Sequence, residues 1–99
     1  MQININSVHF KADKKLTAFI NNKLGKLTHL YEGVIGSDVT LKLENTDAPE
    51  NKIAEIRVFI RGNDLYAKKQ CKTFEEATDQ AIDALKRQIT KYKEKIKAH

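Results

Sequence analysis

The 99-residue sequence contains one cysteine, one proline and no tryptophan. Because a lone Cys71 cannot form an internal disulfide, the composition favours a reducing compartment over secretion. One proline and four glycines also exclude a linker or low-complexity chain. No apolar run approaches the ~18 residues of a membrane-spanning helix, and residues 1–5 lack the basic and apolar regions of a signal peptide. We therefore expect a cytoplasmic protein with no membrane partner.

Residue patterns that carry catalytic or cofactor chemistry are missing as well. There is no glycine-rich phosphate loop and no dinucleotide-binding fingerprint. His9, His29 and His99 are scattered, with no metal-ligand spacing to Cys71. A nucleophilic pair of Cys71 with His29 is conceivable, but a lone strand cysteine is usually a small core residue. We predict no catalytic residue, no metal site and no cofactor.

The charge is unevenly distributed along the chain, whose formal net charge is +5. Residues 1–83 contain 12 basic and 12 acidic side chains, whereas residues 84–99 contain six basic side chains and one acidic side chain. The whole positive excess therefore lies near the C-terminal end of the chain. A basic end on an otherwise neutral domain indicates a polyanionic partner.

Hydrophobic periodicity predicts four strands and two helices. Apolar and polar residues alternate in four short segments, near residues 1–5, 39–43, 54–61 and 65–71. Apolar residues recur at helical spacing in two longer segments, over about 14–29 and from Thr73 to Ile96. An exposed loop with the only proline is expected over residues 45–51.

Short polar residues and glycines predict where these elements begin, end or pack closely. Asp13 is a suitable N-cap for the first helix, and Thr73 with Glu76 forms a capping box for the last one. Gly62-Asn63 fits the centre of a type II′ hairpin turn. Gly25, inside the first helix, is expected to mark a close packing contact.

The order strand, helix, three strands, helix predicts a two-layer α+β fold, β-α-β-β-β-α. The last three strands should form an antiparallel meander, and the first helix is long enough to let the first two strands pair in parallel. Each helix has one apolar stripe, so both should pack on the same face of a four-stranded mixed sheet. Lys69, at an inward position of the fourth strand, indicates that this strand is an edge. We expect residues 1–99 to form a single domain.

The last helix places its cations beside its apolar stripe. With Leu85 taken as the direction of the core, the basic residues fall on two flanks, one with Lys86, Lys93 and Lys97 and the other with Arg87, Lys91 and Lys95. Acids at the start and lysines at the end of a helix also suit its dipole and are typical of a merely solvated helix. Six cations against one anion exceed what the dipole requires, because its effect fades within the last turn.

The first helix adds Lys15, Lys23 and Lys26 to the basic inventory. If the two helices lie side by side, their lysines border one positive surface. Lysine-rich surfaces bind phosphates without reading bases, and A-form RNA is recognised largely by shape, so RNA is favoured over sequence-specific DNA. A double-stranded-RNA-binding module stays open as an alternative, although its basic contacts concentrate at the start of the last helix, which is acidic here. A small protein-interaction domain or enzyme subunit also stays open.

Two segments resemble the ribosome hibernation-promoting factors. These are the run TFEEA at residues 73–77, which leads into AIDALKRQITKYKEKIK at residues 81–97, and the run KLGKL at residues 23–27. This family also includes the ribosome-associated inhibitor called protein Y and was once labelled sigma-54 modulation protein. The resemblance covers essentially the whole chain in the same β-α-β-β-β-α order, and RQITK at residues 87–91 is its most specific part.

The resemblance implies a non-enzymatic factor of stationary phase or stress. Members bind the small ribosomal subunit and its ribosomal RNA in the channel used by messenger and transfer RNA, block initiation, and in some cases promote pairing of ribosomes into inactive dimers. The implied RNA-binding residues are Lys23, Lys26, Lys86, Arg87, Gln88, Lys91, Lys93 and Lys95. The partner is thus expected to be the ribosome, with no DNA, no membrane and no cofactor, and the protein itself is expected to be monomeric.

The sequence departs from the family pattern at three positions. Ala84 stands where relatives often have a basic residue, and Lys86 supplies the charge instead. Thr73 replaces an aspartate but keeps the cap, and Lys69 replaces a small residue on the fourth strand. Because the chain ends at His99, soon after the last helix, it is expected to be the short form, without the dimerisation domain of the long form.

Overall fold

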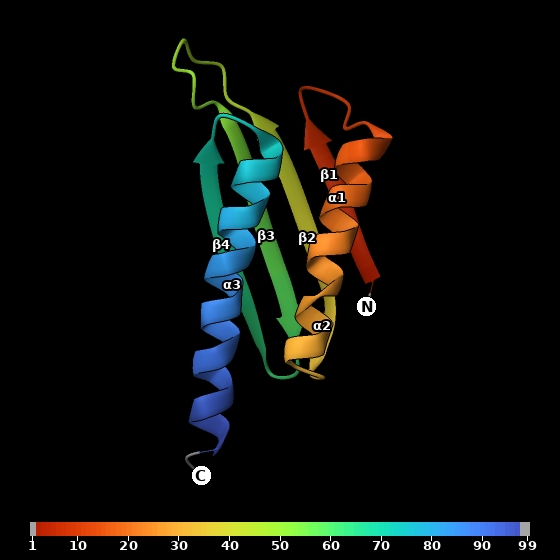
Figure 1. Ribbon diagram of the computed structural model, residues 1–99, viewed down its shortest axis with the longest axis vertical. Coiled ribbons are helices and arrows are strands. Elements are labelled where there is room, and N and C mark those ends of the chain that lie inside the picture. Colours follow the sequence, from red (N-terminus) through yellow and green to blue (C-terminus); the bar gives the residue numbers. More distant parts are fainter. Residues whose placement is uncertain (1, 98–99) are drawn as a thin grey trace.

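The computed structural model describes residues 2–97, apart from the side chains of residues 28, 96 and 97. Four strands and three helices follow one another along the chain (Figure 1). In chain order they are β1 (Gln2–Val8), α1 (Lys14–Gly25), α2 (Leu27–Leu30), β2 (Val34–Leu43), β3 (Lys52–Ile60), β4 (Asn63–Cys71) and α3 (Phe74–Lys97). The predicted two-layer β-α-β-β-β-α fold is confirmed, with α2 a short continuation of the first helix.

The four strands form one mixed sheet in the order β1-β2-β3-β4. Strand β1 pairs with β2 in parallel, and the other two pairings are antiparallel, as predicted. The register aligns Ile5, Val39, Ile56 and Ala67 in one row across the sheet. Because residues in such a row point to the same face, the alternating apolar positions of all four strands meet on one side.

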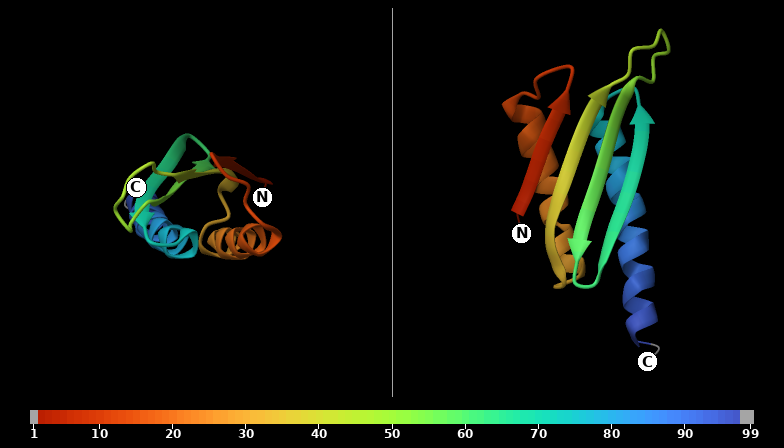
Figure 2. Two further views of the ribbon diagram at one scale, coloured as in Figure 1. Left: turned by 90° about the horizontal axis from the view of Figure 1, so that it is seen from above. Right: turned by 180° about the vertical axis from the view of Figure 1, so that it is seen from behind.

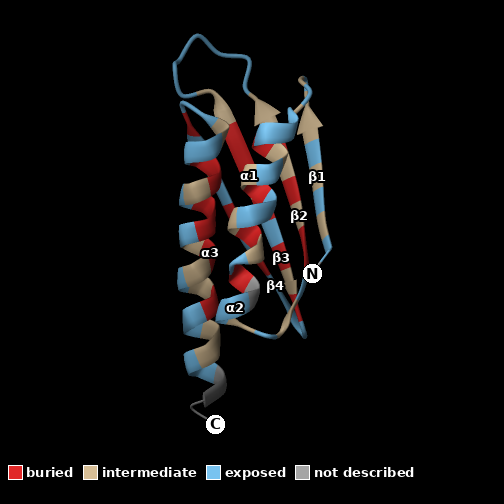
Figure 3. Ribbon diagram, turned by 45° about the vertical axis from the view of Figure 1, so that its right-hand side comes forward, coloured by how far each residue is buried: buried red, intermediate tan, exposed pale blue. Residues whose placement is uncertain are grey.

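All helices cover that apolar side of the sheet, and the opposite side is open (Figure 2). The buried residues line the interface between the two layers, on the inward faces of both sheet and helices (Figure 3). Leu24, Leu41, Ile56, Leu85 and Ile89 are among the fully buried side chains. Lys69 is half-buried on the edge strand β4, in the row of Leu41 and Ala54, which confirms that strand as an edge.

Both predicted N-caps are present. The backbone N–H of Leu16 donates to the Asp13 carboxylate at 2.8 Å, and Asp13 itself has extended dihedrals, as an N-cap requires. At the start of α3 the N–H of Glu76 donates to the Thr73 hydroxyl at 3.0 Å. Each cap satisfies one of the backbone donors that a helix start leaves without a partner in the helix.

The prediction of one continuous helix over 14–29 is wrong at one position. Helix α1 ends at Gly25, Lys26 separates it from α2, and the N–H of His29 bonds back only three residues to the Lys26 carbonyl at 3.2 Å. Such tightened hydrogen bonds are common at helix ends, and glycine is a poor helix former. The expected packing contact at Gly25 is also wrong, because a Cβ there would meet nothing within 4 Å.

The hairpin turn between β3 and β4 lies one residue earlier than predicted. Ile60 pairs with Asn63, so Arg61 and Gly62 are the two loop residues. Gly62 has φ +81°, and the non-glycine residues with positive φ in the described chain do not include Arg61. A positive φ at the second central residue alone is the pattern of a type II turn, not of type II′.

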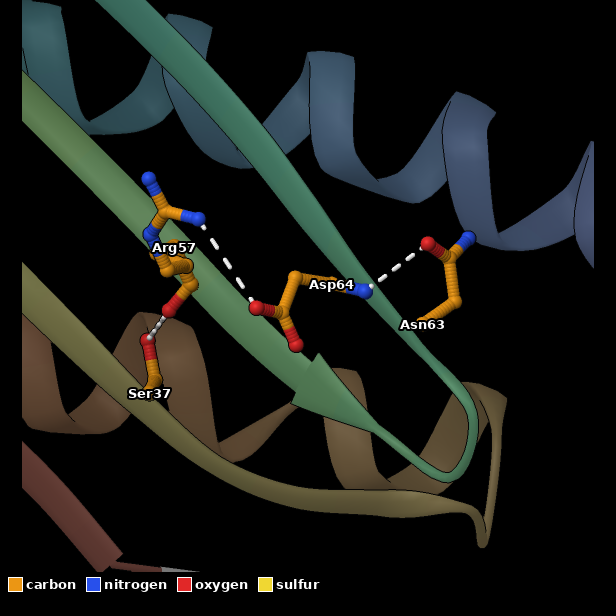
Figure 4. Close-up of polar contacts among 4 residues, drawn as sticks. All are labelled: Ser37, Arg57, Asn63 and Asp64. Atoms are coloured by element: carbon orange, nitrogen blue, oxygen red, sulfur yellow. Dashed lines mark hydrogen bonds and ion pairs between the residues drawn. The ribbon is translucent and has the colours of Figure 1, made fainter.

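Charged side chains on the open face of the sheet form ion pairs with one another. Glu55 of β3 lies between Lys42 and Lys68, at 3.5 and 3.6 Å. Nearer the hairpin, Arg57 pairs with Asp64 at 3.7 Å, while its backbone carbonyl accepts from the Ser37 hydroxyl on β2 (Figure 4). Exposed pairs of this kind contribute only about 0–1 kcal/mol each. They do, however, balance the charge on this side of the molecule.

Substitution of Thr78 by valine is expected to stabilise the protein. Thr78 is fully buried on the sheet-facing side of α3, and its hydroxyl has no hydrogen-bond partner among the described residues. Because an unsatisfied buried hydroxyl costs about 1–3 kcal/mol, Thr78→Val should raise the free energy of unfolding in urea by about 1 kcal/mol. The control is Thr90→Val, since the exposed Thr90 hydroxyl donates to the Lys86 carbonyl at 2.9 Å. A lower urea midpoint for Thr78→Val would contradict this account.

Candidate nucleic-acid interface

The outer surface of the helical layer carries the predicted site residues. Helices α1 and α2 run beside α3 on the same face of the sheet, in both the front and end-on views (Figures 1 and 2). This arrangement confirms that the first and last helices lie side by side, which the predicted shared surface of their lysines requires. The surface has three parts: the contact of α1 with α3, the contact of α2 with α3, and the flank of α3 that lies towards β4.

Helix α3 is oriented as the sequence predicts. Leu85 and Ile89 are fully buried against the sheet, and Tyr92 is half-buried. Lys86 and Lys93, on one predicted flank, are half-buried, while Arg87, Lys91 and Lys95, on the other, are exposed. Lys97 and Ile96 have side chains outside the described set.

One flank of α3 faces α2. The Lys93 ammonium donates to the carbonyl of Leu30, the last residue of α2, at 2.8 Å. The Tyr92 ring meets the Tyr31 ring edge-on, with centroids 5.8 Å apart, and its hydroxyl donates to the Arg61 carbonyl at 3.3 Å. A cation at a helix C-terminus is favoured by the helix dipole. Lys93 therefore joins the two helices as well as adding charge to their surface.

The other flank of α3 lies over the edge strand. The Gln88 amide donates to the Tyr66 carbonyl of β4 at 2.8 Å, so this side chain fastens the helix to the strand. Between the two flanks, the solvent-facing side of α3 has a shallow depression lined by Lys86, Arg87, Thr90, Lys91 and Glu94. Glu94 is the single acid of residues 84–99.

Lys23 and Lys26 of the predicted set come from the first helix. The Lys23 ammonium lies 3.4 Å from the Asp79 carboxylate of α3 and 5.5 Å from the centre of the Phe19 ring. Lys26 is exposed at the break between α1 and α2. Of the eight predicted residues, Lys23 alone forms an ion pair with a residue that the structure describes. The cations of α3 thus remain available for an anionic partner.

The structure does not bring together the conceivable nucleophile pair. Cys71 ends β4 beside the start of α3, whereas His29 lies in α2, at the opposite end of the sheet (Figure 1). Burial raises the pKa of the Cys71 thiol, the carboxylates of Glu76 and Glu50 raise it further, and Lys69 opposes them. A raised pKa disfavours the thiolate, which is the reactive form. Over residues 2–97 there is also no cluster of side chains that could hold a metal ion, and no described helix could cross a membrane.

Sequence patterns did not reveal a group of phenylalanines at the end of the helical face where α1 and α3 begin. Phe10, from the loop after β1, stacks on Phe74, the first residue of α3, with ring centres 4.6 Å apart. Phe19 of α1 lines a cavity together with these two rings. These rings are far apart in sequence, so their proximity follows only from the placement of α1 beside α3. The only feature of the sequence that could have linked these three positions is that each is a phenylalanine.

The fold and the unbalanced cations define a small basic α+β domain suited to a polyanionic partner. The sequence profile described as "Sigma 54 modulation protein / S30EA ribosomal protein" matches residues 3–97. The chain belongs to this family. Ribosome hibernation promoting factors of Salmonella typhimurium and Escherichia coli are 29% and 28% identical to it over 99 residues, with both chains fully covered in each comparison.

Two solved structures share the fold. A ribosomal subunit interface protein from Coxiella burnetii has a TM-score of 0.83 at 17% identity, over 94% of this chain and 98% of that one. The N-terminal domain of Protein Y from Thermus thermophilus has a TM-score of 0.81 at 22% identity, over 93% of this chain and 99% of that one. At such low identity the likeness establishes the architecture alone.

The exposed cations of α3 are expected to be dispensable for folding. Replacing Arg87, Lys91 and Lys95 together with alanine should change the free energy of unfolding little, or raise it slightly, because like charges four residues apart repel. By contrast, Ile89→Ala should cost about 2–5 kcal/mol, since Ile89 is fully buried. Urea denaturation of both variants gives the comparison. A triple variant that unfolds, or an Ile89→Ala protein as stable as the parent, would contradict the observed orientation of α3.

Cys71 is expected to behave as an inert core thiol. Native protein at neutral pH should react with iodoacetamide much more slowly than the same protein in urea, because the thiol is both buried and protonated. Mass spectrometry over time measures the two rates. Similar rates in both conditions would show that Cys71 is accessible in the folded state.

Proposed function

We propose that the protein is a non-enzymatic ribosome hibernation factor that binds ribosomal RNA of the small subunit through its helical face. Membership of the family supports this function, since the curated relatives are named ribosome hibernation promoting factors. The observation that carries it is the set of exposed cations on α3, which have no ion-pair partners among the described residues. Activity on ribosomes would place the protein in the cytoplasm.

The charge distribution favours RNA on the helical side over the open side of the sheet. On the open side, Glu55 engages Lys42 and Lys68, and Asp64 engages Arg57. Phosphates approaching that side would meet cations that already have partners. On the helical side, Arg87, Lys91 and Lys95 gain favourable contacts and lose mutual repulsion when phosphates lie alongside them.

The mechanism proposed is occlusion of the channel used by messenger and transfer RNA. A domain 49 Å long is large enough to obstruct such a channel while it remains bound. The described residues offer no activated nucleophile or metal cluster with which to cut or modify RNA. Inhibition should therefore be stoichiometric and reversible, and excess initiator transfer RNA with messenger should displace the protein from the subunit.

Charge reversal tests the binding surface. Arg87, Lys91 and Lys95 changed together to Glu, or Lys23 and Lys26 changed to Glu, should abolish small-subunit binding and translation inhibition together. A matched control for the triple variant reverses Lys52, Lys68 and Lys72, which lie on or beside the sheet strands, and so makes the same change in net charge as that variant. If about five phosphates are neutralised, log affinity of the parent protein should fall with log salt at a slope of about −4 to −5.

Three results would contradict the proposal. Binding that does not respond to a several-fold change of salt would remove its electrostatic basis. Equal loss of binding in the control variant would show that net charge alone matters. Inhibition that persists after the protein has been washed away, or ribosomal RNA that is recovered nicked, would replace occlusion with a chemical mechanism.

A further inference from the structure

The largest aromatic cluster of the protein encloses a cavity that the proposed function leaves unused. A cavity of about 380 Å³ lies between the loop after β1, the first turns of α1 and the start of α3. Its apolar walls come from Leu16, Phe10, Phe19 and Phe74. Three of the four phenylalanines of the chain are thus gathered at one place, and all three are only half-buried. An exposed aromatic hollow is unfavourable in water unless a ligand covers it.

The walls present flat apolar surface. The Phe10 and Phe74 rings are stacked at 4.6 Å with only 13° between their planes, so together they form a slab that extends from the loop to α3. Phe19 approaches from α1 and has the Lys23 ammonium on its ring. His9, the residue before Phe10, has a φ of 71°, which is uncommon for a residue other than glycine. Conformations of this kind concentrate at binding sites.

The rim of the cavity carries two lysines and two carboxylates. Lys11 and Lys15 line it, and neither makes an ion pair with a described residue. Of the two acids beside them, Asp13 already accepts the N–H of Leu16 as the cap of α1. Asp13 and Glu75 are both exposed and both keep their negative charge, so a bound phosphate must lie closer to the lysines than to them. Aromatic walls beside two lysines without ion pairs match a nucleotide, whose base stacks on rings and whose phosphates pair with lysines.

We infer that this cavity receives one unpaired base of the RNA, with its neighbouring phosphates on Lys11 and Lys15. The inference rests on the proposed binding of ribosomal RNA and adds a stacking contact to its electrostatic surface. No amide side chain lines the cavity to read a base edge, so the contact should tolerate any base and prefer purines for their larger stacking area. Lys23, which pairs with Asp79, lies over the Phe19 ring that lines the cavity, so the RNA contact would extend from the cavity along the helical face.

The first experiment uses the free protein and a single-stranded oligoadenylate at low salt, without ribosomes. The NMR signals of the Phe10, Phe19 and Phe74 rings should shift on titration, while those of Phe59, on the open side of the sheet, should not. Saturating oligonucleotide with no shift of the three ring signals would overturn the inference. Because ribosomes are absent, this result is independent of whether the protein binds the small subunit.

The second experiment measures affinity for small subunits. Phe19→Leu, which keeps an apolar side chain but removes the ring, should weaken binding about fivefold or more, and Phe59→Leu is the matched control. The double variant with Lys11 and Lys15 changed to Gln, which leaves the core intact, should flatten the salt slope by about 1–2. Glu75→Gln should strengthen binding. Unchanged affinity in all three pocket variants would overturn the inference and leave the proposed function standing.

A photo-crosslinking residue at position 19 separates RNA from protein as the occupant. Crosslinks to ribosomal RNA would support the inference. Crosslinks to a ribosomal protein alone would overturn it, since the cavity would then hold an apolar side chain of that protein. Failure of the parent protein to bind subunits, with the ring shifts intact, would refute the proposed function and keep the cavity as a site for single-stranded RNA.

Discussion

Packing of α3 against the sheet determines where every charge in the last quarter of the chain lies. Leu85 and Ile89 are fully buried, and the helix is held on one side by Gln88 on β4 and on the other by Lys93 on α2. Rotating the helix by the 100° of one residue would turn Lys86 into the core. Burying an unpaired ammonium is costly enough to forbid that rotation. Burial of the apolar stripe therefore closes the core and also fixes the direction in which the basic flanks point.

The same helix divides the helical face into two electrostatic halves. Its first turns carry Glu75, Glu76 and Asp79, and the last of these is neutralised by Lys23 from α1. Its last turns carry the exposed cations and meet α2 through a backbone carbonyl instead of a carboxylate. Acids near the start and bases near the end both agree with the helix dipole. One arrangement thus stabilises the helix and concentrates uncompensated positive charge at one end of the surface.

Periodicity in the sequence was sufficient to predict the layers, the strand pairing and the orientation of α3, because each depends on many residues that agree. Features that depend on one residue were predicted less well. The break at Lys26 reflects a change of hydrogen bonding within a single turn, and the hairpin is displaced because Gly62 supplies its positive φ at the second loop position. At the candidate site, the exposure of the α3 cations followed from helical geometry, and their contacts with RNA stay predictions.

Sequence patterns did not predict contacts between segments that are far apart along the chain. The bond from Gln88 to Tyr66 joins residues 22 positions apart, and the bond from Lys93 to Leu30 joins residues 63 apart. Both depend on how the layers are stacked, which no local pattern specifies. The aromatic cavity was overlooked for the same reason, since Phe10 and Phe74 become neighbours only after β1 and α3 have taken their places.

Helix α3 is longer than the sheet that supports it, and its last turns extend past the ends of the strands (Figures 1 and 2). Tyr92, in contact with Tyr31, is the last of its apolar side chains with a described tertiary contact. Lys93 still bonds to the Leu30 carbonyl, but the described side chains beyond it, Glu94 and Lys95, are exposed. The helix at these two residues therefore relies on backbone hydrogen bonds and the intrinsic preference of lysine and glutamate for helices, which is marginal in water. Local opening there should require little free energy, so its amides would exchange with solvent faster than those around Leu85. A partner that covers this end of α3 must supply the free energy that keeps the last turns helical. Protection of their amides from exchange with solvent therefore reports whether the partner is bound.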